Sequence, residues 1–248
     1  MPYETTIWLL LLIFAAAILY SSVGHGGASA YLAAMALFGV APAVMKPTAL
    51  VLNVLVAAIG SYRFYRAGRF SWQLFWPFAV TSVPMAFVGG SIALAVTAYR
   101  TVVGIVLLYA AVQLLTRARH ESPEPARPPR VSMALAIGAG LGLLSGLTGV
   151  GGGIFLTPLV LLMNWSKTRE AAGVSALFIL VNSISGLVGL FMASEIPPPP
   201  TFAYWAPPVV LVGGYIGSEL GSRRLDTTWL RRLLSVVLLI AGLKLILS

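Results

Sequence analysis

Cysteine is absent from the 248-residue sequence, and histidine occurs only twice. Without thiols, the chain has no disulfide bonds, no thiolate metal ligands and no cysteine nucleophile. One histidine, His25, lies in an apolar context, and the other, His120, lies in a polar stretch. The sequence therefore predicts neither a metal centre nor a bound cofactor.

Charged residues are also scarce. They make up 9% of the chain, against about 25% in a typical soluble domain. Hydrophobic residues make up 58%, and the mean hydropathy is +0.92. A soluble fold of this length needs more polar surface to cover its core, whereas a surface that faces lipid does not. The composition therefore indicates a membrane protein.

The few charges are unbalanced, with 16 basic and 7 acidic residues. In a soluble protein such an excess would suggest nucleic-acid binding. Here the basic residues lie in short joints between apolar stretches, which is the pattern of topology determinants. We therefore expect the lipid bilayer as the environment and no nucleic-acid partner. Residues 1–6 contain no basic residue ahead of the first apolar run, so we expect a retained helix and not a cleaved signal peptide.

Ten apolar segments follow one another along the chain. They are residues 6–22, 27–41, 47–64, 72–96, 99–117, 131–147, 153–165, 169–193, 203–222 and 229–247. Most are long enough to cross a hydrocarbon core, which takes about 20 residues. The second and seventh are shorter and are flanked by glycine-rich and polar residues. The sequence predicts an all-α membrane protein of about ten transmembrane or half-membrane helices.

The extended polar stretch at 118–130 divides the segments into five and five. It is rich in proline and charge and is predicted to be a linker between residues 1–117 and 131–248. Placing this linker in the cytoplasm puts thirteen basic residues on the cytoplasmic side, as the distribution of lysine and arginine requires. These are Arg63, Arg66, Arg69, Arg117, Arg119, Arg127, Arg130, Lys167, Arg169, Arg223, Arg224, Arg231 and Arg232. The outer loops then carry Lys46 and Arg100, with Lys244 near that surface, and both termini face outward.

The two halves share residues in the same order. The pairs are Gly24-His25-Gly26-Gly27 with Gly149-Val150-Gly151-Gly152, Thr48-Ala49-Leu50 with Ser175-Ala176-Leu177, Trp76 with Trp205, Gly89 with Gly217, and Arg100 with Arg231. The offset drifts slowly between about 125 and 131. Because five crossings is an odd number, homologous halves enter the bilayer in opposite directions. The sequence therefore predicts two inverted five-segment repeats.

Two glycine-rich turns precede the two short segments: residues 23–29 and 148–153. Glycine allows positive φ angles, and backbone amides exposed ahead of a helix bind anions. Short, glycine-interrupted segments at corresponding places in two halves point to the binding site of a transporter. The alternative is that these glycines only allow close helix packing. The symmetric pair favours a substrate site built from Gly24, His25, Gly26, Gly27, Gly149, Gly151, Gly152 and Gly153.

The sequence resembles the sulfite exporter TauE/SafE family from about residue 7 to residue 247. The resemblance depends on GLTGVGGGIFLTPLVLL at 146–162, on the Lys167–Ser175 stretch and on the repeated layout of the halves. The first half departs from the pattern, because His25 stands where Val150 stands in the second and no residue corresponds to Pro158. The resemblance implies export of sulfite, or of related sulfonate and organosulfur anions, across the cytoplasmic membrane.

Four polar residues inside the third and eighth segments extend the candidate site: Thr48, Asn53, Ser175 and Asn182. Amides and hydroxyls donate to oxyanions without carrying a fixed charge through the bilayer. Their alternative role is interhelical hydrogen bonding, which in membranes is often worth less than about 1 kcal/mol. Ser21, Ser22 and Ser145 precede the turns and are weaker candidates.

His25 is the candidate for proton coupling, because a histidine titrates near neutral pH and also donates to anions when neutral. Its alternative role is packing of the turn. Glu219 is expected to be structural and paired with Arg223, four residues later. Lys46 precedes Pro47 at an expected helix start and is interpreted as an interface anchor, with a role in an outer vestibule left open.

Three function classes remain to be weighed: a transporter of small inorganic or organosulfur anions, an intramembrane enzyme, and a structural or partner-recruiting subunit. One histidine in the apolar segments and one glutamate expected in a salt bridge do not supply a catalytic set. The paired polar turns favour a transporter over a structural subunit. The sequence does not determine the oligomeric state.

Overall fold

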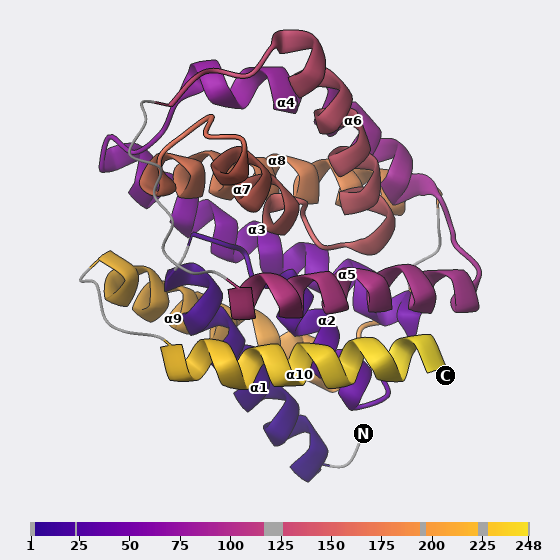
Figure 1. The fold of residues 1–248 in the computed structure, drawn as a ribbon. Coiled ribbons are helices and arrows are strands. Elements are labelled where there is room, and N and C mark those ends of the chain that lie inside the picture. The colour runs from indigo at the N-terminus through magenta and orange to yellow at the C-terminus, as the bar shows by residue number, and fades with distance from the viewer. Residues whose placement is uncertain (1–2, 23, 117–125, 194–196, 223–227, 248) are drawn as a thin grey trace.

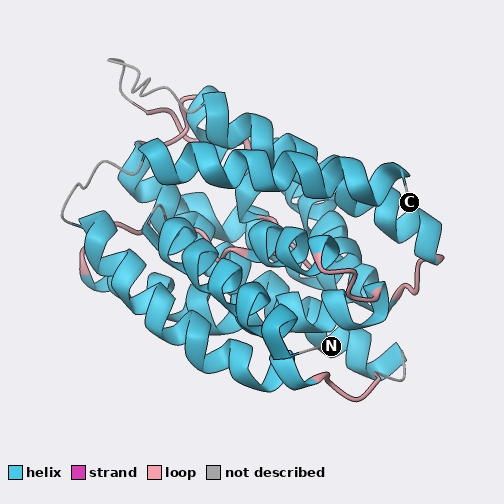
Figure 2. Cartoon of the chain, turned by 90° about the horizontal axis from the view of Figure 1, so that it is seen from below, coloured by secondary structure: helices cyan, strands magenta, loops and turns pink. Residues whose placement is uncertain are grey.

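The computed structural model describes residues 3–22, 24–116, 126–193, 197–222 and 228–247, and leaves undescribed the side chains of 114, 116, 221, 222 and 228–234. All regular secondary structure in these ranges is helical (Figures 1 and 2). The ten helices are α1 (Tyr3–Ser22), α2 (Ala28–Leu37), α3 (Pro42–Arg66), α4 (Trp72–Ser91), α5 (Val96–Thr116), α6 (Val131–Thr148), α7 (Gly153–Leu162), α8 (Thr168–Ala193), α9 (Thr201–Ser222) and α10 (Thr228–Leu247). The prediction of an all-α protein with ten helical segments is confirmed.

The largest differences between predicted segments and helices include the start of α3. The helix begins at Pro42, and Pro47 lies inside it. Pro42 takes the first position of the helix, where a proline costs no helical hydrogen bond because the N–H group that it lacks has no partner there. The expectation that Pro47 stands at the helix start was therefore wrong.

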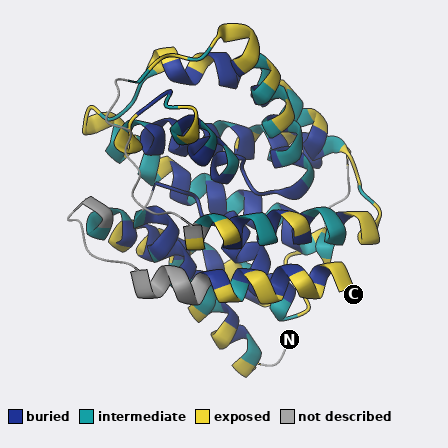
Figure 3. Cartoon of the chain, in the orientation of Figure 1, coloured by how far each residue is buried: buried dark blue, intermediate teal, exposed yellow. Residues whose placement is uncertain are grey.

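The surface and the lengths of the helices fit a bilayer. Within the described residues, α1, α3, α4, α5, α6 and α8 are long and apolar enough to cross a membrane. Large apolar side chains such as Leu11, Val80 and Ile105 are exposed on these helices, while the buried residues gather in the middle of the bundle (Figure 3). Such an exterior is costly in water and costs nothing against lipid tails.

The helices pack in pairs around a central pair. α3 and α8 lie against each other in the middle of the molecule. α4 and α6 pack together and against α8, α1 packs on α9, and α5 runs beside α10 (Figure 1). α9 also contacts α3, so α3 and α8 each have a flanking pair.

Glycine allows the closest of these contacts, those of α4 with α6 and α8. A methyl group on Gly142 would overlap the backbone of Ser82, and one on Gly146 would overlap the carbonyl oxygen of Ala86. Gly90 of α4 meets the backbone of Gly186 in the same way. Small residues at such contacts let membrane helices approach closely enough to gain from backbone packing.

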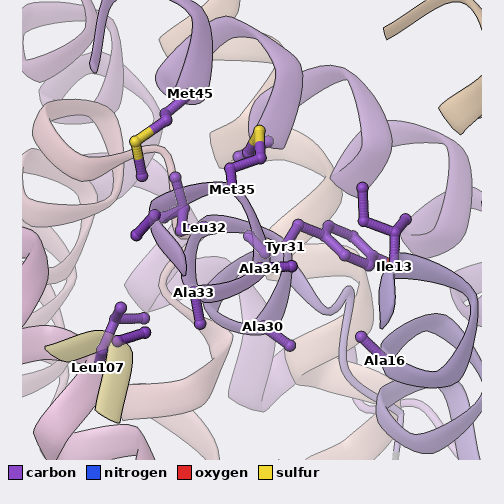
Figure 4. Packing of buried hydrophobic residues seen from close by; sticks show 14 of the residues in the cluster. Ile13, Ala16, Ala30, Tyr31, Leu32, Ala33, Ala34, Met35, Met45 and Leu107 are labelled. Carbon is purple, nitrogen blue, oxygen red and sulfur yellow. The ribbon is translucent and has the colours of Figure 1, made fainter. Parts of the chain in front are cut away.

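α2 and α7 are short, with ten residues each, and correspond to the two short predicted segments. In α2 every residue from Ala28 to Ala36 is buried. Figure 4 shows Tyr31, Leu32 and Met35 of this helix beside Ile13 of α1, Met45 of α3 and Leu107 of α5. α7 packs against α8 and belongs to a second apolar cluster. Both half-length helices therefore lie inside the bundle.

Glu219 joins two helices. Its Oε2 accepts from Nη1 of Arg63 at 3.3 Å, and the Arg63 guanidinium also lies over the Tyr215 ring, 4.5 Å from its centroid. The ion pair links α3 to α9, which is a structural role as expected. The expected partner Arg223 lies outside the described residues, as do Arg117, Arg119, Arg224 and most of the 118–130 linker.

Candidate functional site

The first glycine turn joins α1 to α2. Gly24 and Gly27 have φ angles of 78° and 94°, in the left-handed region that favours glycine. The carbonyl of Ser21 accepts from the Gly24 N–H at 3.2 Å. Gly27 is the N-cap residue of α2 and, having no side chain, supplies no side-chain cap. α2 therefore begins at a turn that only backbone and neighbouring helices can satisfy.

The second turn, between α6 and α7, repeats these features. Gly149, Gly151 and Gly152 have φ angles of 82°, 83° and 77°. The carbonyl of Ser145 accepts from the Gly149 N–H at 2.8 Å, as that of Ser21 does for Gly24. Gly152 is the left-handed N-cap of α7, again with no side-chain cap.

The two turns meet at the side chain of Asn53 in α3. Asn53 Oδ1 accepts from the N–H of Ala28, the first residue of α2, at 3.1 Å. Its Nδ2 donates to the carbonyl of Val150 in the second turn at 3.1 Å, and to Oγ of Ser183 at 3.4 Å. Asn53 is completely buried. One amide thus joins both turns to α3 and α8.

The glycines at this meeting point have no room for a side chain. A Cβ atom on Gly26 would overlap Asn53 Oδ1 and would lie 3.0 Å from Ile179 Cγ2. One on Gly151 would lie 2.6 Å from Asn53 Nδ2 and 2.9 Å from the same Ile179 atom. Gly26 and Gly151 therefore face the same two side chains, Asn53 and Ile179.

Away from Asn53, the turns contact α3 at different points along its length. A Cβ on Gly24 would meet the Phe64 ring and the Cβ of Ala172. A Cβ on Gly149 would lie 3.2 Å from the carbonyl oxygen of Lys46. Since Lys46 and Phe64 lie on either side of Asn53 in α3, the turns approach Asn53 from opposite directions.

All twelve predicted site residues are buried. The structure brings Gly26, Asn53 and Gly151 together. Ser175 Oγ instead accepts from Oγ1 of Thr157 in α7 at 2.7 Å. Asn182 Nδ2 donates at 2.7 Å to the carbonyl of Phe178 in its own helix. Within the described residues, no bond links Asn182 to either turn.

Polar atoms without a described hydrogen-bond partner remain near the turns. They include Oγ of Ser21 and Oγ of Ser145, which are buried in the last turns of α1 and α6. Ser145 lies beside Gly152, whose Cβ would be 3.5 Å from that of the serine. Asn182 Oδ1 is a third such atom. Buried hydroxyls in this state keep a donor to offer.

His25 lies on the α1 side of the first turn and is 5% exposed. The backbone N–H of His25 donates to the backbone carbonyl of Tyr20 at 2.8 Å. The imidazole meets the Tyr20 ring edge-on, with 6.3 Å between centroids, and Tyr20 Oη accepts from Oγ of Ser29 at 2.7 Å. His25 is thus part of a polar and aromatic group at the start of α2.

Lys46 is not the interface anchor that the sequence suggested. The side chain is buried, and its Nζ donates to the carbonyls of Gly89, Gly90 and Ile92 at 3.2, 3.0 and 3.4 Å. The chain turns Lys46 inward because the last carbonyls of α4 have no partner within that helix.

The sequence did not indicate Ser183, Ile179 or Thr157, although all three contact predicted site residues. Ser183 directly follows Asn182, so the polar pair could have been considered together. Ile179 carries no polar signal. In the described residues, no group of three or more histidine, aspartate or glutamate side chains lies close enough to hold a metal ion.

Comparison with known proteins gives concordant matches. Residues 9–245 match the family described as "Sulfite exporter TauE/SafE". The chain is 41% identical over 244 residues to "Probable membrane transporter protein y4hK" of Sinorhizobium fredii, covering 97% of this chain and 98% of that one. It is 27% identical over 121 residues to "Probable membrane transporter protein YunE" of Bacillus subtilis, covering 47% and 42%. No solved structure matches the chain.

The bridge through Asn53 predicts a specific cost. Asn53→Leu is expected to lower the free energy of unfolding in detergent by about 2 kcal/mol or more, because the Ala28 N–H and the Val150 carbonyl lose their buried partner. Asn182→Leu is the matched control, since its described bond stays within α8. Thermal unfolding of both variants measures the difference, and equal destabilisation would contradict the bridge.

Proposed function

The chain belongs to the sulfite exporter TauE/SafE family of membrane transporters, and from this premise we propose that it exports a small oxyanion, sulfite or a related sulfonate or organosulfur anion. The family establishes a transporter and not an enzyme. The substrate and its binding site are the parts that we infer.

The meeting of the two turns at Asn53 supports this proposal most. Both α2 and α7 begin there, and neither has a side-chain cap from its own N-cap residue. The N-terminus of a helix carries a partial positive charge and unpaired N–H donors, and two of them at one place suit an anion. Transporters commonly bind their substrates at such interrupted helices.

We propose that the anion is bound by the backbone N–H groups of Gly26, Gly27 and Gly151–Gly153 together with the hydroxyls of Ser21 and Ser145. The N–H groups of Gly24 and Gly149 already donate to the carbonyls of Ser21 and Ser145, so these two glycines shape the turns. Ser21 lies three residues before Gly24 and Ser145 four residues before Gly149, and the hydroxyl of each has an unused donor. Thr48, Ser175 and Asn182 lie further out in this proposal. Asn53 holds the turns in position, because its amide is already bonded to both. Since these residues are buried, an anion reaches them only when the surrounding helices move apart.

Export of an anion needs no energy source other than the membrane potential. Moving one charge through 100 mV is worth about 2.3 kcal/mol, so a monoanion leaves a negative cytoplasm downhill by that amount and a dianion by twice it. The sequence contains no GxxxxGK[ST] loop for ATP. Uptake would need a coupling ion, and His25 is our candidate for the residue that carries it as a proton.

We also propose that the halves 1–117 and 131–248 are inverted repeats. Helix pairing supports this: α1 packs on α9 as α6 packs on α4, while α3 pairs with α8 and α5 with α10. A two-fold axis that exchanges the halves relates each of these pairs to another or to itself. In such a repeat the 118–130 linker lies on the opposite side of the membrane from both termini, and the distribution of basic residues favours the cytoplasm for the linker and the outside for the termini.

Flux through the purified protein tests the function. In liposomes, the wild-type chain is expected to move sulfite down its gradient without a partner, and Ser21→Ala or Ser145→Ala to slow it by roughly tenfold, the loss of one hydrogen bond to a charged group. Ser91→Ala is the control, because Ser91 is bonded only to Val88 of its own helix in the described residues. A panel of sulfur oxyanions defines the substrate. Flux no faster than in empty liposomes would favour a structural or partner-recruiting subunit.

Cysteine labelling tests the topology. The sequence contains no cysteine of its own, so only an introduced cysteine reacts. Tyr3 and Arg127 are both exposed. A membrane-impermeant maleimide is expected to label Tyr3→Cys in intact cells, and Arg127→Cys only after the cells are opened. Labelling of both from the same side would contradict an odd number of crossings between the N-terminus and the linker.

His25 is expected to tune transport without building the site, because Val150 fills the matching place in the second turn. His25→Val should preserve folding but weaken flux, or flatten its dependence on pH between about 5 and 8, where an unperturbed histidine titrates. His25→Gln separates the roles, since an amide donates a hydrogen bond but carries no proton. Flux retained in Gln and lost in Val indicates donation, and pH dependence lost in both indicates proton handling. Wild-type behaviour of both would return His25 to a packing role.

A further inference from the structure

Lys46 places a cation inside the bundle. Its side chain is 7% exposed, and Nζ donates to three backbone carbonyls at the end of α4. The C-terminus of a helix carries about half a negative charge, so these carbonyls only partly neutralise an ammonium group.

Within the described residues, no carboxylate forms an ion pair with Lys46, whereas Arg63 pairs with Glu219. A buried charge with only neutral partners is costly to keep. Ionisable groups inside membrane helices are functional candidates for this reason.

Lys46 also lies against the second glycine turn. A Cβ on Gly149 would be 3.5 Å from both Cα and Cγ of Lys46. Lys46 precedes Asn53 by seven residues, about two turns of α3, so the two project from the same face of the helix. The ammonium group and the bridge between the turns therefore belong to one surface of α3.

We propose that Lys46 supplies the positive charge that binds the transported oxyanion at the second turn. In the closed structure, the carbonyls of α4 hold the ammonium group. When the helices part, the anion replaces these carbonyls as its partner. This inference rests on the proposed function and adds a charged ligand to a site otherwise made of neutral donors.

The competing role is a structural cap for α4, and the chain offers a control for it. Lys244 Nζ donates to the carbonyl of Leu37 at the end of α2 at 2.9 Å. The chemistry matches that of Lys46, but Lys244 is exposed.

The test compares Lys46→Gln, Lys46→Arg and Lys244→Gln with the wild type in liposomes and in detergent. Gln still donates to the α4 carbonyls but carries no charge, whereas Arg keeps the charge. Lys46→Gln is expected to raise the sulfite concentration for half-maximal flux roughly tenfold or more, and to remove the thermal stabilisation that sulfite gives in detergent. Lys46→Arg should keep saturable stabilisation, and Lys244→Gln should behave as the wild type. Wild-type sulfite dependence in a folded Lys46→Gln would leave only the capping role.

A second measurement uses the wild-type protein and does not depend on the folding of a variant. Sulfite is expected to lower the labelling of Lys46 by an amine reagent, with Lys244 as the internal reference in the same digest. Lys46 that is unreactive, or equally reactive with and without sulfite, would contradict the inference. Absence of wild-type flux would contradict the proposed function itself, whereas flux that ignores Lys46 would contradict this inference alone.

Discussion

The buried amide of Asn53 satisfies the constraint on which the centre of this protein depends. Irregular backbone at membrane depth persists only where its N–H and C=O groups find partners within the protein. Asn53 provides one acceptor to the start of α2 and one donor to the turn before α7. Because one side chain serves both turns, they must lie close together, and α2 and α7 must begin at the same place.

The Asn53 amide explains why glycine occupies the key positions of both turns. Positive φ angles at Gly27 and Gly152 allow the chain to turn sharply into each half-length helix. The absence of Cβ atoms at Gly26 and Gly151 leaves room for Asn53 and Ile179 between the turns. A side chain at either position would displace the Asn53 amide, and the Ala28 N–H and the Val150 carbonyl would then lose their hydrogen-bond partner. The glycine pattern is therefore as much a consequence of interhelical bonding as of local turn geometry.

Local signals explain what the sequence predicts and what it does not. Apolar runs reveal all ten helices, and glycine clusters reveal both turns, because hydropathy and turn chemistry are local properties. The bond from Asn53 to Val150 spans 97 residues and exists only because α3 and the second turn both pack against α8. Ile179 contributes through shape, which no pattern reports. Lys46 was misplaced for the same reason: its partners are carbonyls of another helix, which become available only where α4 ends.

The division between backbone and side chains also explains why family membership does not determine the substrate. Backbone N–H groups at two helix starts attract any small oxyanion, since they recognise negative charge and acceptor oxygens. The features that distinguish one anion from another must then come from side chains that break the symmetry of the turns. His25 has Val150 as its counterpart, and Lys46 aligns with a stretch around Gly173 that offers no charge. If the anion binds where we propose, selectivity is expected to depend on side chains such as His25 and Lys46, which have no polar or charged counterpart in the second half.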